Sequence, residues 1–204
     1  MTGLLRDLAL AAGLVVYAVR KRLATGSRGA RVSARNGRVA GLVRRAPGPR
    51  TLVHGVSVGE THALEPFVEA LAASPLGPDV VVSASTATGF ERARRIHTGR
   101  REVVRFPLDF TWMVARFLDG VRPELVVLGE LELWPSFLAA CGRRGIPVCV
   151  VNGRLSERSY RGYRRWRILA RRMFRRLAWV SAQTEVYRDR FVALGVPGDR
   201  VVVG

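Results

Sequence analysis

The sequence predicts an α/β fold in which a parallel sheet carries helices on both faces. Short apolar runs rich in valine recur from residue 51 onward, and longer segments with apolar residues at helical spacing separate them. The hydrophobic content of 48% is high enough for a substantial core. Strands that alternate with helices along a chain are typical of parallel sheets whose crossover helices pack on both faces.

The expected strands and helices follow one another from residue 51 onward. Each strand is assigned to a short apolar run bounded by turn residues, and each helix to the segment that follows it. The strands are expected at residues 51–54, 79–84, 103–106, 124–128, 146–151 and 178–182. The helices are expected at residues 61–73, 88–97, 111–119, 134–144, 159–176 and 184–194. Ligands bind such sheets at the carboxyl ends of the strands, so the loops after the strands should carry the functional residues.

Two segments precede this domain, which covers residues 51–204. Residues 8–19 are apolar apart from a tyrosine, and three basic residues follow at once. The run is shorter than the roughly 20 residues that span a bilayer comfortably, so we interpret residues 1–23 as a membrane-anchor helix, either monotopic or a short span. A buried helix of a soluble domain is the alternative. Residues 24–50 are rich in Gly, Ser and Arg and should form a basic linker over an anionic surface.

The charge balance points to anionic partners. The formal net charge is +18, with 34 Lys and Arg against 16 Asp and Glu, and Lys21 is the only lysine. An arginine bias of this kind is also what a GC-rich genome produces, and no RNA- or DNA-binding signature accompanies it, so nucleic acid is not expected as a partner. Residues 158–176 combine arginines with apolar residues at helical spacing. This basic amphipathic segment is either a solvated face or a contact for lipid head groups or phosphates.

The stretch from Val56 to Thr61 joins the first expected strand to the first expected helix. Gly59 should permit a sharp turn, and Glu60 would then project from the turn into a cleft. Backbone amides at the start of the helix favour anions. The alternative interpretation is that Glu60 caps the first helical turn.

Polar side chains follow the other strands at the same edge of the sheet. These candidates are Thr86, Thr88, Glu130, Glu132, Asn152, Arg154 and Gln183. Carboxylates are the members of the set that are suited to catalysis. Glu60 is the candidate general base for a hydroxyl nucleophile, and Glu130 or Glu132 would orient a group or stabilise developing positive charge.

Missing motifs argue against several other chemistries. The three histidines are scattered and no pair has a zinc spacing. The chain has no Gly-x-x-x-x-Gly-Lys-Ser/Thr loop and no Gly-x-Gly-x-x-Gly in the first βα turn. We therefore expect neither a metal nor a cofactor. Cys141 and Cys149 should be buried free thiols.

A series of motifs runs in order through the domain. They are His54–Thr61, Thr86–Arg92, Arg122–Val127, Gly129–Pro135, Arg143–Val148, Asn152–Ser159, Ala182–Glu185 and Arg190–Gly195. With these motifs the chain resembles the N-terminal half of bacterial 3-deoxy-D-manno-octulosonic acid (Kdo) transferases of lipopolysaccharide synthesis. The apolar run near the N-terminus also resembles the membrane anchor of that family, which would place the chain at the cytoplasmic face of the bacterial inner membrane.

The resemblance implies a two-domain GT-B fold in which this chain is the Rossmann-like, acceptor-side half. It implies a metal-independent, inverting transfer of Kdo from CMP-Kdo to a lipid A precursor. Glu60 matches the general base of the family, and Glu130 matches a carboxylate that supports the transition state. Arg154 would suit a phosphate of the acceptor. The remaining substrate-binding candidates are Ser57, Gly59, Thr86, Thr88, Glu132, Asn152 and Gln183.

The chain also departs from the family pattern. Family members continue beyond the point matching Gly204 into a C-terminal domain that supplies most of the CMP-Kdo site. That donor domain is absent from the sequence, so the chain alone is expected not to transfer Kdo. Residues 24–50 lack the usual basic and aromatic pattern, and Gly129 stands where methionine is more usual. The alternative function is a non-catalytic, membrane-attached module that binds anionic lipid, or a decayed fragment.

Overall fold

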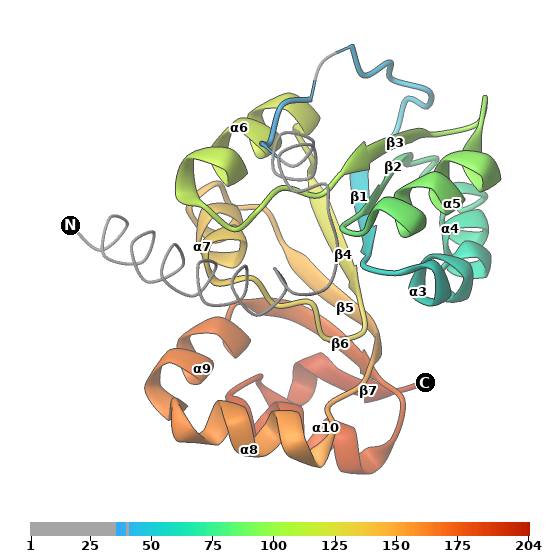
Figure 1. The fold of residues 1–204 in the computed structure, drawn as a ribbon. Coiled ribbons are helices and arrows are strands. Elements are labelled where there is room, and N and C mark those ends of the chain that lie inside the picture. Colours follow the sequence, from blue (N-terminus) through green and yellow to red (C-terminus); the bar gives the residue numbers. More distant parts are fainter. Residues whose placement is uncertain (1–35, 40) are drawn as a thin grey trace, which may run out of the picture.

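A seven-stranded parallel sheet forms the centre of the computed structural model, which describes residues 36–39 and 41–204 (Figure 1). The strand order is β3-β2-β1-β4-β5-β6-β7. The strands are β1 (Arg50–Gly55), β2 (Asp79–Ala84), β3 (Glu102–Arg105), β4 (Leu125–Gly129), β5 (Val148–Gly153), β6 (Leu177–Ala182) and β7 (Val201–Val203). The predicted parallel sheet is confirmed, and the six expected strands lie within two residues of their expected bounds.

Helices cover both faces of the sheet, as predicted (Figure 1). They are α3 (Val58–Ala63), α4 (Glu65–Ala72), α5 (Ala87–His97), α6 (Thr111–Val121), α7 (Pro135–Arg143), α8 (Glu157–Arg165), α9 (Arg167–Phe174) and α10 (Glu185–Leu194). Helices α3, α4 and α5 pack on one face, and α6, α7, α9 and α10 pack on the other. Four helices begin behind a Ser or Thr cap at the carboxyl edge, where the side-chain oxygen accepts a backbone N–H: Ser57, Thr86, Ser156 and Thr184.

The prediction was wrong in three details of these elements. The helix expected at 61–73 is broken at Leu64, because Pro66 belongs in the first turn of a new helix, where its missing N–H removes no hydrogen bond. The helix expected at 159–176 is broken at Trp166, whose φ of −111° and ψ of 44° are not helical. Strand β7 was missed because it has only three residues, too few for a recognisable pattern.

The larger hydrophobic core lies between the sheet and α6, α7, α9 and α10. Five fully buried phenylalanines form its bulk: Phe106, Phe117, Phe137, Phe174 and Phe191. A smaller core joins β1, β2 and β4 to α4 and α5. Both cores pack the helices firmly against the sheet, so the loops at its carboxyl edge start from rigid elements.

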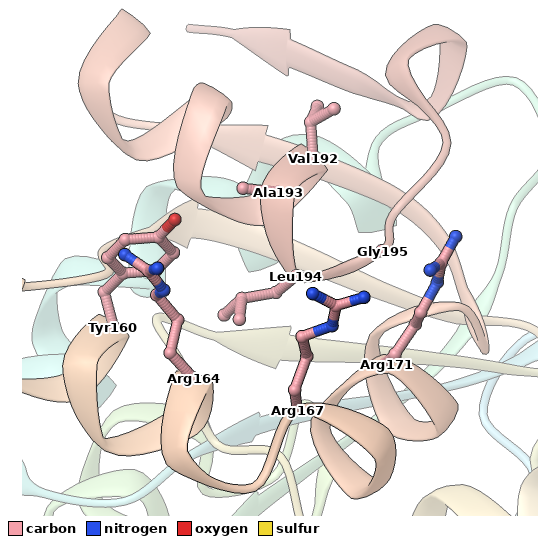
Figure 2. Close-up of a pocket in the computed structure, with 8 residues that line it drawn as sticks. All are labelled: Tyr160, Arg164, Arg167, Arg171, Val192, Ala193, Leu194 and Gly195. Atoms are coloured by element: carbon pink, nitrogen blue, oxygen red, sulfur yellow. The ribbon is translucent and has the colours of Figure 1, made fainter.

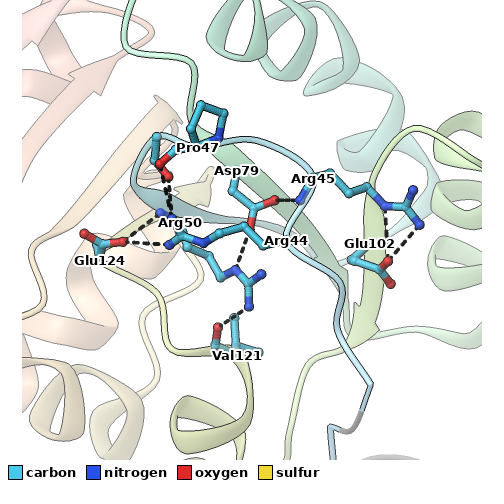
Figure 3. Close-up of polar contacts among 9 residues, drawn as sticks. Arg44, Arg45, Pro47, Arg50, Asp79, Glu102, Val121 and Glu124 are labelled. Carbon is cyan, nitrogen blue, oxygen red and sulfur yellow. Dashed lines mark hydrogen bonds and ion pairs between the residues drawn. The ribbon is translucent and has the colours of Figure 1, made fainter.

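Ion pairs attach the segment before β1 to the amino edge of the sheet (Figure 3). The buried Arg50 guanidinium donates to Asp79 at 2.6 Å and to the carbonyl of Val121 at 3.1 Å. Arg45 pairs with Glu102, and Arg44 pairs with Glu124. The last part of the expected basic linker is therefore neutralised by carboxylates of the domain itself.

The expected anchor at residues 1–23 and the linker up to residue 35 lie outside the described residues, so both assignments stay predictions. Within the part of the chain that the structure describes, no helix is long and apolar enough to cross a membrane.

Candidate active site at the carboxyl edge of the sheet

The order of the strands reverses between β1 and β4. From β1 the chain proceeds to β2 on one side, whereas β4 pairs with β1 on its other side and leads on to β5. Such a reversal is the position where open α/β sheets bind their ligands. Glu60 follows β1 and Glu130 follows β4, so both carboxylates flank this position.

Reciprocal hydrogen bonds hold the Glu60 carboxylate. The hydroxyl of Ser57 accepts the backbone N–H of Glu60 at 3.4 Å and donates to Glu60 Oε1 at 3.0 Å. Glu60 Oε2 accepts the backbone N–H of Val56 at 2.8 Å. This arrangement resembles a capping box, except that the carboxylate accepts the N–H of Val56 and not that of the N-cap residue Ser57. Glu60 therefore caps the start of α3, as the alternative interpretation predicted. Each carboxylate oxygen has a further lone pair, so the same contacts also leave the group able to accept a proton.

Gly59 does not make the expected sharp turn. It lies in the first turn of α3 and is not among the described residues with positive φ, and a Cβ there would meet only Ser57 Oγ at 4.0 Å. The extended backbone of Ser57, with φ −116° and ψ 175°, makes the turn instead. The amide of Val56, just before α3, is already bound by the carboxylate of Glu60.

Glu130 occupies an unusual backbone conformation directly after β4. Its φ is 55°, and the left-handed conformation costs a non-glycine residue about 1–2 kcal/mol. Its backbone N–H donates to the carbonyl of Val151 at 3.0 Å, which holds the loop against β5. Burial raises the pKa of the Glu130 carboxyl, the charge of Glu60 raises this pKa further, and the charge of Arg154 lowers it. Glu60 and Arg154 are thus both within electrostatic reach of Glu130.

Thr86 supports the loop that carries Glu60. Its hydroxyl caps α5 by accepting the N–H of Gly89 at 3.0 Å and donates to the carbonyl of Val56 at 2.9 Å. A Cβ on Gly89 would approach that carbonyl to 3.0 Å and Thr86 Oγ1 to 2.8 Å, so only glycine fits there without a shift. Thr88 is exposed in the first turn of α5.

The other predicted residues are distributed along the same edge. Gln183 Nε2 donates to Asn152 Oδ1 at 2.9 Å, which joins the ends of β5 and β6. Asn152 has a φ of 54° and, like Arg154, is exposed. Burial raises the pKa of Tyr163 on α8, and the charge of Glu132 raises it further.

Sequence reasoning missed three supports of the site. The backbone of Val56 links the Glu60 loop to the α5 loop, and Gly89 permits their close approach. Buried Asp109 accepts the N–H groups of Ser136 and Phe137, each at 2.8 Å, and so caps α7 beside the Glu130 loop. Helix α7 begins without a side-chain cap of its own, which was the available signal that an acceptor from elsewhere was needed.

The described residues contain no group of three or more His, Cys, Asp or Glu side chains that could hold a metal. The expectation that the reaction uses no metal or cofactor stays a prediction.

The fold is that of a Rossmann-like α/β domain of the GT-B type. The solved structure of UDP-GlcNAc 2-epimerase from Neisseria meningitidis bound to UDP-GlcNAc shares this fold, with a TM-score of 0.55 and 14% identity over 76% of this chain and 45% of that chain. The sequence model of the 3-deoxy-D-manno-octulosonic-acid transferase (kdotransferase) family matches residues 27–204, and the chain belongs to this family. The resemblance carried by the motifs is confirmed.

Individual relatives agree with this assignment. The 3-deoxy-D-manno-octulosonic acid transferase of Haemophilus influenzae is 30% identical over 149 residues, which cover 73% of this chain and 35% of the relative. A bifunctional glycosyltransferase/methyltransferase of Fusobacterium nucleatum is 31% identical over 151 residues, which cover 73% of this chain and 23% of the relative. The chain thus matches about a third or less of the length of these relatives.

Proposed function

We propose that this chain is the acceptor-side domain of a transferase that moves Kdo from CMP-Kdo to a lipid A precursor. The observation that carries the proposal is the electrostatic coupling of Glu60 and Glu130 at the reversal of strand order. Membership of the family supplies the reaction class. The donor would bind to a second domain that faces this edge, at the cytoplasmic face of the bacterial inner membrane.

In the proposed reaction Glu60 is the general base. Its carboxylate takes the proton of an acceptor hydroxyl, the hydroxyl oxygen attacks the anomeric carbon of Kdo, and the bond to the CMP phosphate breaks with its electron pair on the phosphate oxygen. The hydrogen bonds from Val56 and Ser57 keep the carboxylate in one orientation during this step. A base that is already held in the right orientation lowers the entropic part of the activation barrier.

Glu130 is proposed to assist the same step through its negative charge. When Glu60 takes up the proton, its negative charge disappears, and with it the repulsion that raises the pKa of Glu130. The remaining Glu130 carboxylate then stabilises the positive charge that develops at the anomeric carbon. Arg154 supplies a fixed positive charge at the same edge for a phosphate of the acceptor. Ser57, Thr88, Asn152 and Gln183 are proposed to contact the sugar hydroxyls.

A transfer assay tests this proposal. Membranes that contain the chain are incubated with CMP-Kdo and a lipid A precursor, either alone or with the C-terminal part of a family member on a separate chain. Glu60→Gln is the informative variant, because the glutamine amide oxygen can still accept the N–H of Val56 but does not take up the proton of the acceptor hydroxyl. Glu185→Gln is the matched control, since Glu185 also lies in a first helical turn at this edge.

We expect activity with the added C-terminal part, loss of at least about a hundredfold in Glu60→Gln, and little change in Glu185→Gln. Equal activity of the two variants would remove Glu60 from the role of base. Absence of transfer in every arm, with lipid binding intact, would favour the non-catalytic lipid-binding module.

A further inference from the structure

Helices α8 and α9 meet in an elbow, residues 164–172, that exposes apolar side chains. Trp166 is 73% exposed, Ile168 is 76% exposed and Leu169 is 53% exposed. Ala170, Met173 and Phe174 are the residues of α9 that pack into the core. The exposed apolar residues of the elbow are not part of that buried face. A cluster of exposed large apolar side chains commonly marks an interaction surface.

The same elbow carries positive charge that no carboxylate neutralises. Its exposed arginines are Arg164, Arg165, Arg167, Arg171 and Arg172. Among the described residues none of these five forms an ion pair, since Glu157 on α8 is engaged by Arg161 and Arg190. Arginines elsewhere, such as Arg50 and Arg45, do pair with acidic residues of the domain. Among the described residues, arginines without an ion pair also occur elsewhere, for example Arg92, Arg94 and Arg95 on α5, but no exposed large apolar side chain of α5 accompanies them. The combination of unpaired arginines with exposed apolar side chains distinguishes the elbow.

Three of the arginines line a groove of about 460 Å³ between the elbow and the end of α10 (Figure 2). Figure 2 shows the Arg167 side chain pointing toward Leu194 and Gly195, whereas the Arg164 guanidinium lies over the Tyr160 ring, 5.7 Å from its centroid. Gly195 ends α10 with a φ of 116°, and a Cβ there would come within 2.8 Å of Arg171 Cγ. The glycine therefore makes room for the arginine in the groove.

We propose that the elbow docks on a bilayer that contains anionic phospholipid. Trp166, Ile168 and Leu169 would enter the boundary between head groups and acyl chains, where exposed apolar side chains of basic amphipathic segments lie. The groove arginines would bind head-group phosphates, since a guanidinium pairs with phosphate through two parallel hydrogen bonds. Nucleic acid fits less well, because the aliphatic Ile168 and Leu169 provide no stacking surface for bases.

The test uses the full chain with vesicles of phosphatidylcholine, alone or mixed with phosphatidylglycerol, whose acyl chains carry bromine as a fluorescence quencher. The signal of Trp166 is the part of the quenching that disappears in Trp166→Phe. This readout is local to the elbow, so it does not depend on how other segments attach to the membrane or on transfer activity. We expect the Trp166 signal in the mixed vesicles and its near absence in phosphatidylcholine alone.

A charge-matched pair of variants tests the arginines. Arg164→Gln/Arg167→Gln/Arg171→Gln should raise the concentration of mixed-vesicle lipid needed for half-maximal quenching by about tenfold or more. The control variant removes the same charge from exposed positions of α5, on the other face of the sheet: Arg92→Gln/Arg94→Gln/Arg95→Gln. This control variant should leave the lipid concentration needed for half-maximal quenching unchanged.

Three results would overturn the proposal. The first is no quenching of Trp166 in the mixed vesicles. The second is an equal change in both triple variants, which would reduce the effect to net charge. The third is protection of Trp166 by an RNA oligonucleotide, or by self-association without lipid, because the elbow would then serve another partner.

Discussion

Glu60 raises the pKa of Glu130 from across the reversal of strand order, although the two residues follow different strands. Burial of Glu130 is the larger cause of its raised pKa, and the like charge of Glu60 adds to it because two neighbouring carboxylates disfavour double ionisation. The Glu130 carboxyl therefore holds a proton at a higher pH than an ordinary glutamate does.

Glu130→Gln should stabilise the fold at about pH 7 and leave stability unchanged at about pH 3, well below the ordinary glutamate pKa of about 4.3. The folded-state pKa of Glu130 is raised. Its charge therefore opposes folding above that pKa, and the penalty disappears as the pH falls through it. Thermal unfolding across the pH range measures the effect. Glu185→Gln should have the opposite sign at about pH 7, because Glu185 favours the start of α10. A variant of Glu130 that is less stable than the wild type at neutral pH would contradict the prediction.

Asp79→Ala should lower the free energy of unfolding by about 3–5 kcal/mol, because it leaves the buried Arg50 guanidinium without its carboxylate. Urea denaturation measures the change. Arg44→Ala breaks the ion pair with Glu124, in which the Arg44 side chain is 49% exposed and the Glu124 side chain is 59% exposed. This variant should lower the free energy of unfolding by at most about 1 kcal/mol. Similar losses in both variants would mean that burial does not distinguish the two ion pairs.

Gly89→Ala should destabilise the protein by about 1–3 kcal/mol and also reduce transfer in the complemented assay. The added methyl group presses on the carbonyl of Val56, whose N–H holds the Glu60 carboxylate. Gly162→Ala is the control, since a Cβ in this part of α8 meets no atom within 4 Å. Alanine there should stabilise the helix by about 0.5–1 kcal/mol. Full activity of Gly89→Ala would show that the loop tolerates the shift.

Cys141 should resist alkylation in the folded protein and react only after unfolding. Burial raises its pKa to about 12, so almost none of it is the reactive thiolate at neutral pH. Burial also raises the pKa of Cys149, but this residue is only partly buried and should react first. Mass spectrometry after timed iodoacetamide treatment, with and without urea, identifies the modified residue. Modification of Cys141 before Cys149 in the folded protein would be inconsistent with the packing around α7.

Much of the fold was predictable because its signals are local. Valine-rich runs such as 79–84 and the Ser or Thr caps after them depend on backbone conformation and on contacts a few residues away. The break at Trp166 was harder, because it depends on where the next helix must pack, whereas Pro66 is a local signal for the break at Leu64. For the site, the sequence supplied the candidates but not Val56 or Asp109, whose roles are made by hydrogen bonds to distant loops.

The alternation of strands and helices, the loops that reach the carboxyl edge and the motifs that mark the family can all be recognised in the amino-acid sequence. Which of these loops become neighbours depends on the tertiary structure. The fold brings the charge of Glu60 to bear on Glu130 and the charge of Glu132 to bear on Tyr163. It also pairs the buried Arg50 with Asp79, whereas among the described residues the arginines of the elbow have no carboxylate partner. The reason is that periodicity reflects short-range backbone geometry, whereas the strand order that brings charges together is set by the packing of segments far apart in the chain.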